Sequence, residues 1–286
     1  MYKIESIKSI LGTPKYENDF GVIYHMDCKY GLEQLVKNNI EIDLTITSPP
    51  YNIGKEYEEI VPVQSYVNWL SGICDTIYKL TKEDGAFLLN VGYLKVDGKG
   101  KAVPITYLLW EQIQFYLQQE IVWNYGAGVA GKRFLSPRNE KIMWYIKDPD
   151  NYTFNLDDIR DPDVKYPNQK KNGKLRCNTL GKNPSDVWQI AKVTSGANRS
   201  SAERTDHPAQ FPEDLIERMI KGFSNENELI LDPFMGSGTT AKTAMLNNRK
   251  FLGFEINDSY FNIIADRLDN TLKEIDIKSR TLELFQ

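Results

Sequence analysis

The stretch LILDPFMGSGTTA, residues 229–241, joins a short apolar run to a glycine-rich turn. The run at residues 229–231 predicts a buried strand, and residues 239–246 predict a helix. Between them, Gly236 and Gly238 permit a tight turn and bring backbone N–H groups close to a polar or anionic ligand at the start of the helix. The stretch therefore predicts a strand–turn–helix unit of an α/β fold with a ligand at its turn.

A carboxylate ends the next predicted strand, residues 251–255, at Glu255. Such a carboxylate accepts hydrogen bonds from ribose hydroxyls, so we expect a cofactor that contains a nucleoside. Lys242 follows Ala241 and not a glycine, so the phosphate-binding lysine motif of NTP-hydrolysing enzymes is absent from the sequence. NAD binding stays open on this turn alone, because dinucleotide enzymes share the pattern.

Periodic segments continue on both sides of this unit. Apolar residues three and four apart predict helices, and short apolar runs predict strands. The helices are expected at 63–80, 105–117, 213–222, 239–246 and 259–275, and the strands at 42–47, 86–91, 120–123, 142–146, 229–232 and 251–255. Their alternation predicts an α/β fold with a doubly wound, mostly parallel sheet.

The strand at 42–47 ends in the tetrad Ser48-Pro49-Pro50-Tyr51. Each proline fixes φ and removes an N–H donor, which leaves carbonyl groups free to accept hydrogen bonds. The Ser48 hydroxyl and the Pro49 carbonyl have the chemistry to hold the two protons of an exocyclic amino group, while Tyr51 stacks on an extruded base. Taken alone, the tetrad is more typical of a proline turn capped by serine, with Tyr51 packed in the core.

The tetrad does not stand alone. Residues 47–52 and 232–240 together closely resemble the amino-methyltransferases of bacterial restriction-modification systems. The order, with the tetrad first and the glycine turn last, resembles the β group of that family, whose fold is circularly permuted. The segments His25-Met26-Asp27 and 207–212 also match this group, and the resemblance covers most of the chain except about residues 150–200.

The resemblance implies a seven-stranded methyltransferase sheet with one antiparallel strand, and S-adenosylmethionine as the cofactor. It also implies three parts of the chain. We expect residues 1–149 to form the catalytic part, 150–204 an irregular target-recognition insertion, and 205–286 the cofactor-binding part. A long aperiodic segment, rich in Asn, Asp, Pro, Gly and Lys, occupies the place of that insertion, and a loop of this length calls for a function.

The resemblance also assigns roles to residues. Ser48, Pro49, Pro50 and Tyr51 take the catalytic role, and Glu255 holds the ribose. Asp27 lies near the adenine and amino-acid moieties of the cofactor, and His207, with Pro208 and Gln210, belongs to a segment that closes over its methionine end. His207 is alternatively a cap of the following helix. The methionine and sulfonium part is lined by Asp232, Pro233, Phe234, Gly236, Ser237, Gly238 and Thr239.

The target atom follows from two observations. Methylation at pyrimidine C5 needs a cysteine nucleophile, normally after a proline, and no cysteine here follows a proline. Direct attack by an amino nitrogen needs only alignment and electrostatic stabilisation, so we expect Ser48 to accept a hydrogen bond and the proton to leave for solvent. Family members with serine first in the tetrad mostly methylate cytosine N4, which favours that atom in duplex DNA after base flipping.

Three alternatives stay open. The first is methylation of adenine N6, and the second is an amino-methyltransferase that acts on protein or RNA, whose members carry Asn where this chain has Ser48. The third is a non-catalytic DNA-binding subunit with a decayed cofactor turn. The intact Tyr51, Gly236, Gly238 and Glu255 speak against decay.

Charge gives only local support for DNA binding. The net charge of −4 and the pI of 5.5 have the wrong sign for a protein that coats phosphate. A basic stretch in the aperiodic segment is the candidate for contacts with DNA: Lys165, Lys170, Lys171, Lys174 and Arg176, with Lys182 nearby. A solvated loop beside the acidic run at residues 157–163 is an equally good interpretation.

Composition sets the remaining expectations. With 41% hydrophobic and 26% charged residues and no apolar run long enough to span a bilayer, we expect no membrane association. The first eleven residues lack the apolar core of a secretory signal, so a cytoplasmic location is expected. The three cysteines are far apart and predict neither disulfides nor a metal site. Expected partners are duplex DNA and a cognate restriction endonuclease, with the chain as monomer or homodimer.

Overall fold

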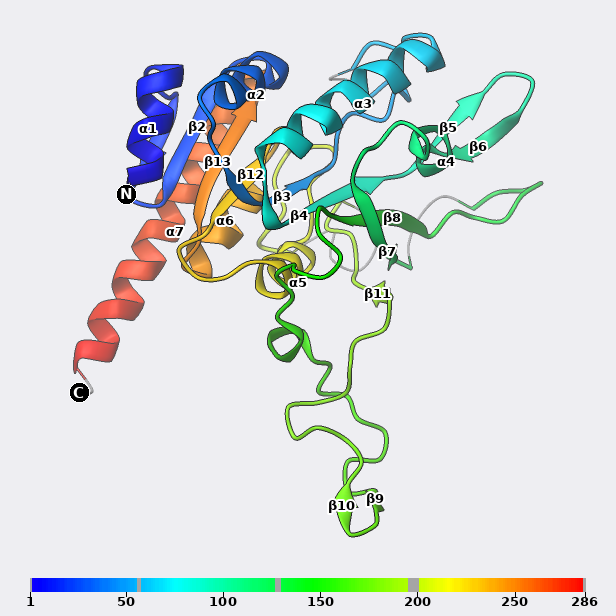
Figure 1. The fold of residues 1–286 in the computed structure, drawn as a ribbon, viewed down its shortest axis with the longest axis vertical. Coiled ribbons are helices and arrows are strands. Elements are labelled where there is room, and N and C mark those ends of the chain that lie inside the picture. Colours follow the sequence, from blue (N-terminus) through cyan, green and yellow to red (C-terminus); the bar gives the residue numbers. More distant parts are fainter. Residues whose placement is uncertain (1, 56–57, 127–129, 195–200, 285–286) are drawn as a thin grey trace.

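The computed structural model describes residues 2–55, 58–126, 130–194 and 201–284. Within this part of the chain, the main sheet has nine strands in the order β1-β2-β13-β12-β3-β4-β8-β7-β11 (Figure 1). In that order, their bounds are Tyr16–Asn18, Gly21–His25, Lys250–Glu255, Leu229–Asp232, Ile42–Thr47, Thr81–Val91, Asn139–Ile146, Tyr116–Asn124 and Val187–Gln189.

The expected seven-stranded sheet forms the centre of this arrangement. From β2 to β4 neighbouring strands are parallel, β8 pairs antiparallel with both β4 and β7, and β7 thus runs in the direction of β4. Two strands of three residues extend the edges, with β1 antiparallel to β2 and β11 parallel to β7. The predicted doubly wound sheet with an antiparallel strand is therefore confirmed, and it is two short strands wider.

Helices cover both faces of the sheet (Figure 1). On one face, residues of α1 (Tyr2–Leu11), α2 (Cys28–Lys37), α3 (Val63–Leu80) and α4 (Ile105–Leu109) share an apolar core with the sheet. On the other, α5 (Glu213–Phe223), α6 (Thr239–Leu246) and α7 (Asp258–Leu284) form the second core. Every residue of the central β3 is buried, as expected for a strand covered on both faces. In the described ranges no helix combines the length and apolarity needed to cross a bilayer.

One predicted helix was wrong in length. Apolar spacing predicted it at 105–117, whereas α4 ends at Leu109 and β7 begins at Tyr116. Pairing of β7 with β8, with Tyr116 opposite Ile146, supplies the hydrogen bonds that local periodicity did not reveal. Several elements had not been predicted, among them α1, β2, α2 and the hairpin of β5 (Tyr93–Val96) with β6 (Gly100–Pro104).

Residues 156–189 of the aperiodic segment form an arm that projects away from the sheet (Figure 1). It starts at the short 3-10 helix η1 (Leu156–Ile159), which packs on α5, and it returns to the sheet at β11. Two backbone hydrogen bonds of 2.9 and 3.0 Å between Asp161 and Lys182 close its base. A two-stranded hairpin, β9 (Lys170–Lys171) with β10 (Lys174–Leu175), lies at its tip. The arm therefore contains more regular structure than its sequence suggested.

The two sequence motifs leave the sheet side by side. β3 and β12 are parallel neighbours, with Ile230 opposite Leu44 and Leu231 opposite Thr45. From β3 the chain continues through α3 to β4 on one side, and from β12 through α6 to β13 on the other. The carboxyl ends of two strands whose connections diverge form the crevice in which α/β sheets bind ligands.

Candidate active site

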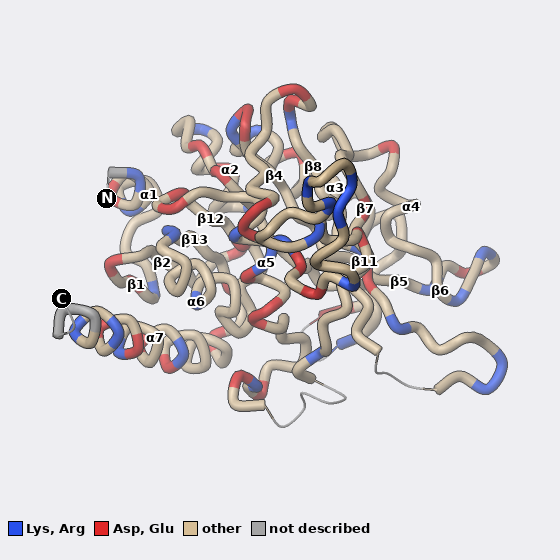
Figure 2. The backbone as a smooth tube through the Cα atoms, turned by 90° about the horizontal axis from the view of Figure 1, so that it is seen from below, with Lys and Arg blue, Asp and Glu red and all other residues tan. Residues whose placement is uncertain are grey.

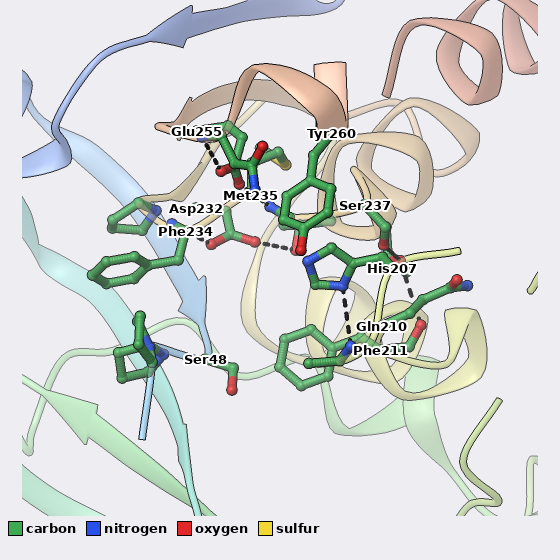
Figure 3. A pocket seen from close by; sticks show the side chains of 18 of the residues that line it. Ser48, His207, Gln210, Phe211, Asp232, Phe234, Met235, Ser237, Glu255 and Tyr260 are labelled. Atoms are coloured by element: carbon green, nitrogen blue, oxygen red, sulfur yellow. Dashed lines mark hydrogen bonds between the residues drawn. The ribbon is translucent and has the colours of Figure 1, made fainter. Parts of the chain in front are cut away.

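A cavity of about 760 Å³ opens at this edge of the sheet and is lined by both motifs (Figure 3). Its size lies within the range of small-molecule sites. All four tetrad residues line it, as do nine of the ten predicted cofactor residues: Asp27, His207, Asp232, Pro233, Phe234, Gly236, Ser237, Thr239 and Glu255. Figure 3 shows Ser48 on one side of this cavity, with Asp232 and Glu255 across it and Phe234 between.

The glycine turn adopts the backbone that its sequence predicts. Gly236 and Gly238 have φ of +55° and +76°, values that residues other than glycine rarely adopt. A Cβ atom at Gly236 would lie 3.0 Å from the ring of His207, so the turn also needs glycine for space. Gly238 does not line the cavity and instead is the N-cap residue that precedes α6. Its role is therefore to shape the turn.

Asp232 connects the two motifs. Its buried carboxylate accepts hydrogen bonds from the hydroxyls of Thr47 (2.8 Å) and Thr240 (2.7 Å) and from the backbone N–H of Phe234 (3.1 Å). Burial raises the pKa of Asp232 to about 6, against the lowering effect of these three donors. At neutral pH the cavity thus holds a negative charge that three donors fix in place.

Glu255 is fixed in a similar way. One carboxylate oxygen accepts from the backbone N–H of Gly236 and the other from that of Asn257, both at 2.7 Å. Burial raises the pKa of Glu255 as well. The glycine turn and the end of β13 therefore hold each other, and the carboxylate lines the cavity.

His207 closes the cavity from the segment before α5. Its Nδ1 atom accepts from the backbone N–H of Ala209 at 3.2 Å, and its ring lies edge-on to Tyr260 at a centroid distance of 4.4 Å. Burial, assisted by Arg267, lowers the pKa of His207 to about 4, so the ring is neutral at physiological pH. A carboxylate oxygen of Glu203 accepts from the first N–H of α5, so His207 is not the cap of that helix.

Asp27 occupies a helix terminus at the cavity rim. It is the N-cap of α2, and its carboxylate accepts from the backbone N–H of Lys29 at 2.7 Å. The side chain is exposed and lines the cavity on the side of β2. Capping and ligand contact are therefore both open to this residue.

The tetrad is held by a cluster of hydrogen bonds that its sequence does not predict. The Ser48 hydroxyl lies 2.9 Å from the Tyr51 hydroxyl, which lies 2.6 Å from Asn90 Nδ2 and 3.1 Å from Glu140 Oε2. The carbonyl of Pro50 accepts from the hydroxyl of Tyr66 at 2.9 Å. The Tyr51 ring packs against Gly92, where a Cβ atom would meet it at 3.0 Å.

The residues that sequence reasoning missed come from elements without a motif. Asn90 is the next-to-last residue of β4, Glu140 is the second residue of the antiparallel β8, and Lys192 follows β11. All three line the cavity, together with Trp123 at the end of β7. Antiparallel pairing brings the start of β8 to the edge of the sheet where β4 ends. No sequence motif predicts which strands pair in this way.

The predicted DNA-binding residues lie elsewhere. Lys165, Lys170, Lys171, Lys174 and Arg176 are exposed on the arm, and none of them lines the cavity. Figure 2 views the molecule from below, so the arm of Figure 1 points toward the viewer. Nearby, Lys182 forms a salt bridge with Asp161 at 3.1 Å.

The donor set fits S-adenosylmethionine. Glu255 suits the ribose hydroxyls, Asp232 supplies negative charge near a sulfonium or ammonium group, and the turn at Gly236 leaves room that a Cβ would fill. The described residues hold no cluster of three or more His, Cys, Asp or Glu that suits a metal ion. Fold and site together are those of an amino-methyltransferase, with the tetrad and the glycine turn lining one cavity.

The comparisons with known proteins give the family. The model of a DNA methylase family of the N6/N4 type matches residues 42–266, and the chain belongs to this family. It is 56% identical to the type II methyltransferase M.ScaI of Streptomyces caespitosus over 93% of this chain and 87% of that protein. It is 36% identical to the type II methyltransferase M.BglII of Bacillus subtilis over 84% of this chain and 67% of that protein.

Solved structures agree with this fold. The PvuII DNA methyltransferase, described as cytosine-N4-specific, superposes with a TM-score of 0.67 at 23% identity, covering 94% of this chain and 95% of that one. A complex of M1.HpyAVI with S-adenosylmethionine gives 0.58 at 24% identity, over 87% of this chain and 98% of that one. The protein is therefore a DNA amino-methyltransferase of the N4/N6 type, with S-adenosylmethionine as its cofactor.

Proposed function

We propose that the enzyme transfers the methyl group to cytosine N4 in duplex DNA, at a short defined site, after the base has been flipped out. The juxtaposition of Ser48 with the glycine turn in one cavity carries the proposal of methyl transfer. Serine in the first tetrad position favours cytosine. The PvuII enzyme, which shares the fold, is described as cytosine-N4-specific.

Adenine N6 is the second candidate. The DNA adenine methyltransferase YhdJ of Escherichia coli is 30% identical over 89% of this chain and 85% of that protein. Both bases present an exocyclic amine with two donors, so the geometry of Ser48 and Pro49 suits either. Analysis of the methylated nucleoside distinguishes the two bases.

The reaction needs little covalent chemistry from the protein. The cofactor supplies a methyl group on a positively charged sulfur. Ser48 and the carbonyl of Pro49 accept the two amine hydrogens and aim the nitrogen lone pair across the cavity. Tyr51 and Trp123 offer ring surface to the extruded base, and the proton is lost to solvent after transfer.

The arm is proposed to read the DNA sequence. Residues 150–204 correspond to the target-recognition part, between the catalytic part at 1–149 and the cofactor-binding part at 205–286. The exposed cations of β9 and β10 support contacts with phosphates and with guanine edges. Replacing the arm with that of a relative is expected to change the methylated site; an unchanged site would remove this role.

The product decides the base. DNA methylated by the purified enzyme with S-adenosylmethionine is digested to nucleosides, and we expect N4-methylcytosine. Finding only N6-methyladenine would assign the second candidate instead. Tritium transfer to protein or RNA but not to DNA would reject both, and failure to bind the cofactor in calorimetry would indicate a non-catalytic subunit.

The proposal also covers the partner enzyme, the cellular location and the oligomeric state. Its relatives are named type II methyltransferases, which supports a cognate restriction endonuclease as the partner enzyme. We place the protein in the cytoplasm, where the DNA of a bacterial host lies, as a monomer or homodimer.

A further inference from the structure

Glu140 is a carboxylate at the catalytic tetrad that belongs to no sequence motif. It lines the cavity at the start of β8 and its side chain is only 14% exposed. Its Oε2 atom lies 3.1 Å from the Tyr51 hydroxyl and 2.8 Å from Asn90 Nδ2. Its Oε1 atom forms a salt bridge of 2.7 Å with Lys192. The carboxylate thus contacts the tetrad on one side and a cation on the other.

Lys192 is itself held in place. Its ammonium group lies 3.7 Å from the centre of the Tyr125 ring and 5.5 Å from that of Trp123. A cation in this position is stabilised by both ring faces, and it forms a close ion pair with the Glu140 carboxylate. An ionised carboxylate has no proton to donate, so it accepts every hydrogen bond that it makes.

The ionised carboxylate fixes the orientation of Asn90. The amide must turn its NH₂ group toward Glu140, because the opposite orientation would place two acceptors 2.8 Å apart. One amide hydrogen goes to Glu140 and the other to the Tyr51 oxygen at 2.6 Å. The Asn90 Oδ1 atom is left buried without a partner among the described residues, which indicates that the NH₂ contacts decide the orientation.

The same carboxylate directs the proton of Tyr51. A phenol has one hydrogen, and Glu140 is a nearer and more strongly negative acceptor than the Asn90 backbone carbonyl at 3.3 Å. Burial and the adjacent Glu140 charge hold the pKa of Tyr51 well above its ordinary value, so this hydrogen is retained. The Tyr51 oxygen is then only an acceptor toward Ser48, and the hydrogen bond of 2.9 Å between them must be donated by Ser48.

We propose that Glu140 is a positioning residue that sets the direction of this chain of hydrogen bonds. The Ser48 hydroxyl then donates its hydrogen to the Tyr51 oxygen and presents its lone pairs to the target amine. The inference rests on the proposed role of Ser48 and applies to cytosine and adenine alike. Without the carboxylate, the Tyr51 hydrogen is free to turn toward Ser48. The Ser48 hydrogen then points at the amine, where an acceptor is required.

Three substitutions separate charge from size. Glu140→Gln keeps the size and removes the charge, and its amide can donate to Tyr51. We expect kcat for methyl transfer to fall roughly 10- to 100-fold, the effect of losing one charge-assisted hydrogen bond, while KM for DNA and cofactor changes less than about twofold. Glu140→Asp keeps the charge and shortens the side chain, so its kcat is expected between those of the wild type and Glu140→Gln. If Glu140 only fills space, Glu140→Asp is the more damaged variant and the proposal is overturned.

A double mutant tests the route through Tyr51. Tyr51→Phe removes the hydroxyl that connects Glu140 to Ser48, so adding Glu140→Gln to it is expected to lower kcat by less than about twofold more. Independent effects that multiply would contradict the proposal. Glu120→Gln is the matched control, because Glu120 on the neighbouring β7 forms a salt bridge of 3.2 Å with Lys141 and does not line the cavity. We expect it to keep wild-type kcat.

The outcome also separates this inference from the proposed function. A wild-type enzyme that transfers no methyl group to DNA would remove the proposed function itself. An active wild type together with a Glu140→Gln variant of equal kcat would remove only the role of Glu140. Melting curves and cofactor affinity, expected to match the wild type, confirm that each variant is folded.

Discussion

Asp232 illustrates at the scale of one residue how burial couples the site to pH. Its carboxylate is 2% exposed, and burial raises its pKa to about 6. The cost of ionising it in the folded protein is offset in part by donors on β3 and α6. The enzyme therefore keeps in its cavity a carboxylate whose charge titrates just below neutral pH.

We predict that cofactor affinity falls as the pH is lowered through 6. Protonation of Asp232 removes the negative charge that attracts the cationic cofactor. At pH 5 only about a tenth of a group with a pKa near 6 is ionised. The Kd for the cofactor is therefore expected to rise up to about tenfold relative to its value at pH 7.5. Glu255, whose pKa is also raised, acts in the same direction, whereas His207 with a pKa of about 4 stays neutral. Calorimetry at the two pH values measures the change.

The isosteric variant Asp232→Asn serves as the comparison. It is expected to bind the cofactor more weakly at pH 7.5 and to depend less on pH. Equal Kd values for the wild type at pH 5 and 7.5 would show that Asp232 does not attract the cofactor.

At the scale of elements, the arm and the cavity lie in separate parts of the molecule, and we expect separate tasks for them. The arm is tied to the fold by η1 on α5 and by β11 on β7, and its basic hairpin lies at the tip away from the cavity. Phosphate contacts by such a hairpin release counterions and make binding dependent on salt.

The double variant Lys170→Gln/Lys171→Gln tests this separation. We predict weaker DNA binding, with the slope of log K against log salt reduced by up to about two, since each phosphate contact contributes about 0.9. Cofactor affinity is expected to be unchanged. The pair Lys273→Gln/Lys278→Gln on α7, far from the arm, removes the same charge and is expected to leave the slope as it is. A slope that is equal in both double variants would argue against the arm as the DNA contact.

At the scale of the whole molecule, the cavity joins parts that are distant in the chain. Asp27 follows β2, Asp232 ends β12 and Glu255 ends β13, and all three line the cavity to which we assign the cofactor. A ligand that binds only the assembled site stabilises the entire fold.

Saturating S-adenosylmethionine is therefore predicted to raise the melting temperature. At one hundred times Kd the stabilisation is about 2.7 kcal/mol, which corresponds to roughly 4–5 °C for a chain of this length. Ser48→Ala, on the side of the cavity that faces the base, is expected to retain this shift while losing most methyl transfer. Loss of the shift in Ser48→Ala would place Ser48 in the cofactor site, against its proposed role. Differential scanning calorimetry and a tritium-transfer assay measure the two effects.

Sequence reasoning succeeded where chemistry is encoded in adjacent residues. The turn at Gly236 and Gly238 has the positive φ values that its glycines predicted, and Glu255 ends a strand as expected. It failed where long-range pairing decides the structure. The stretch after Leu109 has apolar spacing compatible with a helix. It instead forms a turn followed by the strand β7, because β7 pairs with β8.

The sequence by itself determined the class of chemistry, because the tetrad and the cofactor turn are local devices whose residue types dictate what they bind. Only the tertiary structure decided that these devices share one cavity with Asn90, Glu140 and Lys192. The order and direction of strands in a sheet depend on hydrogen bonds between segments far apart in the chain, and strand periodicity carries no record of which neighbour each strand will have.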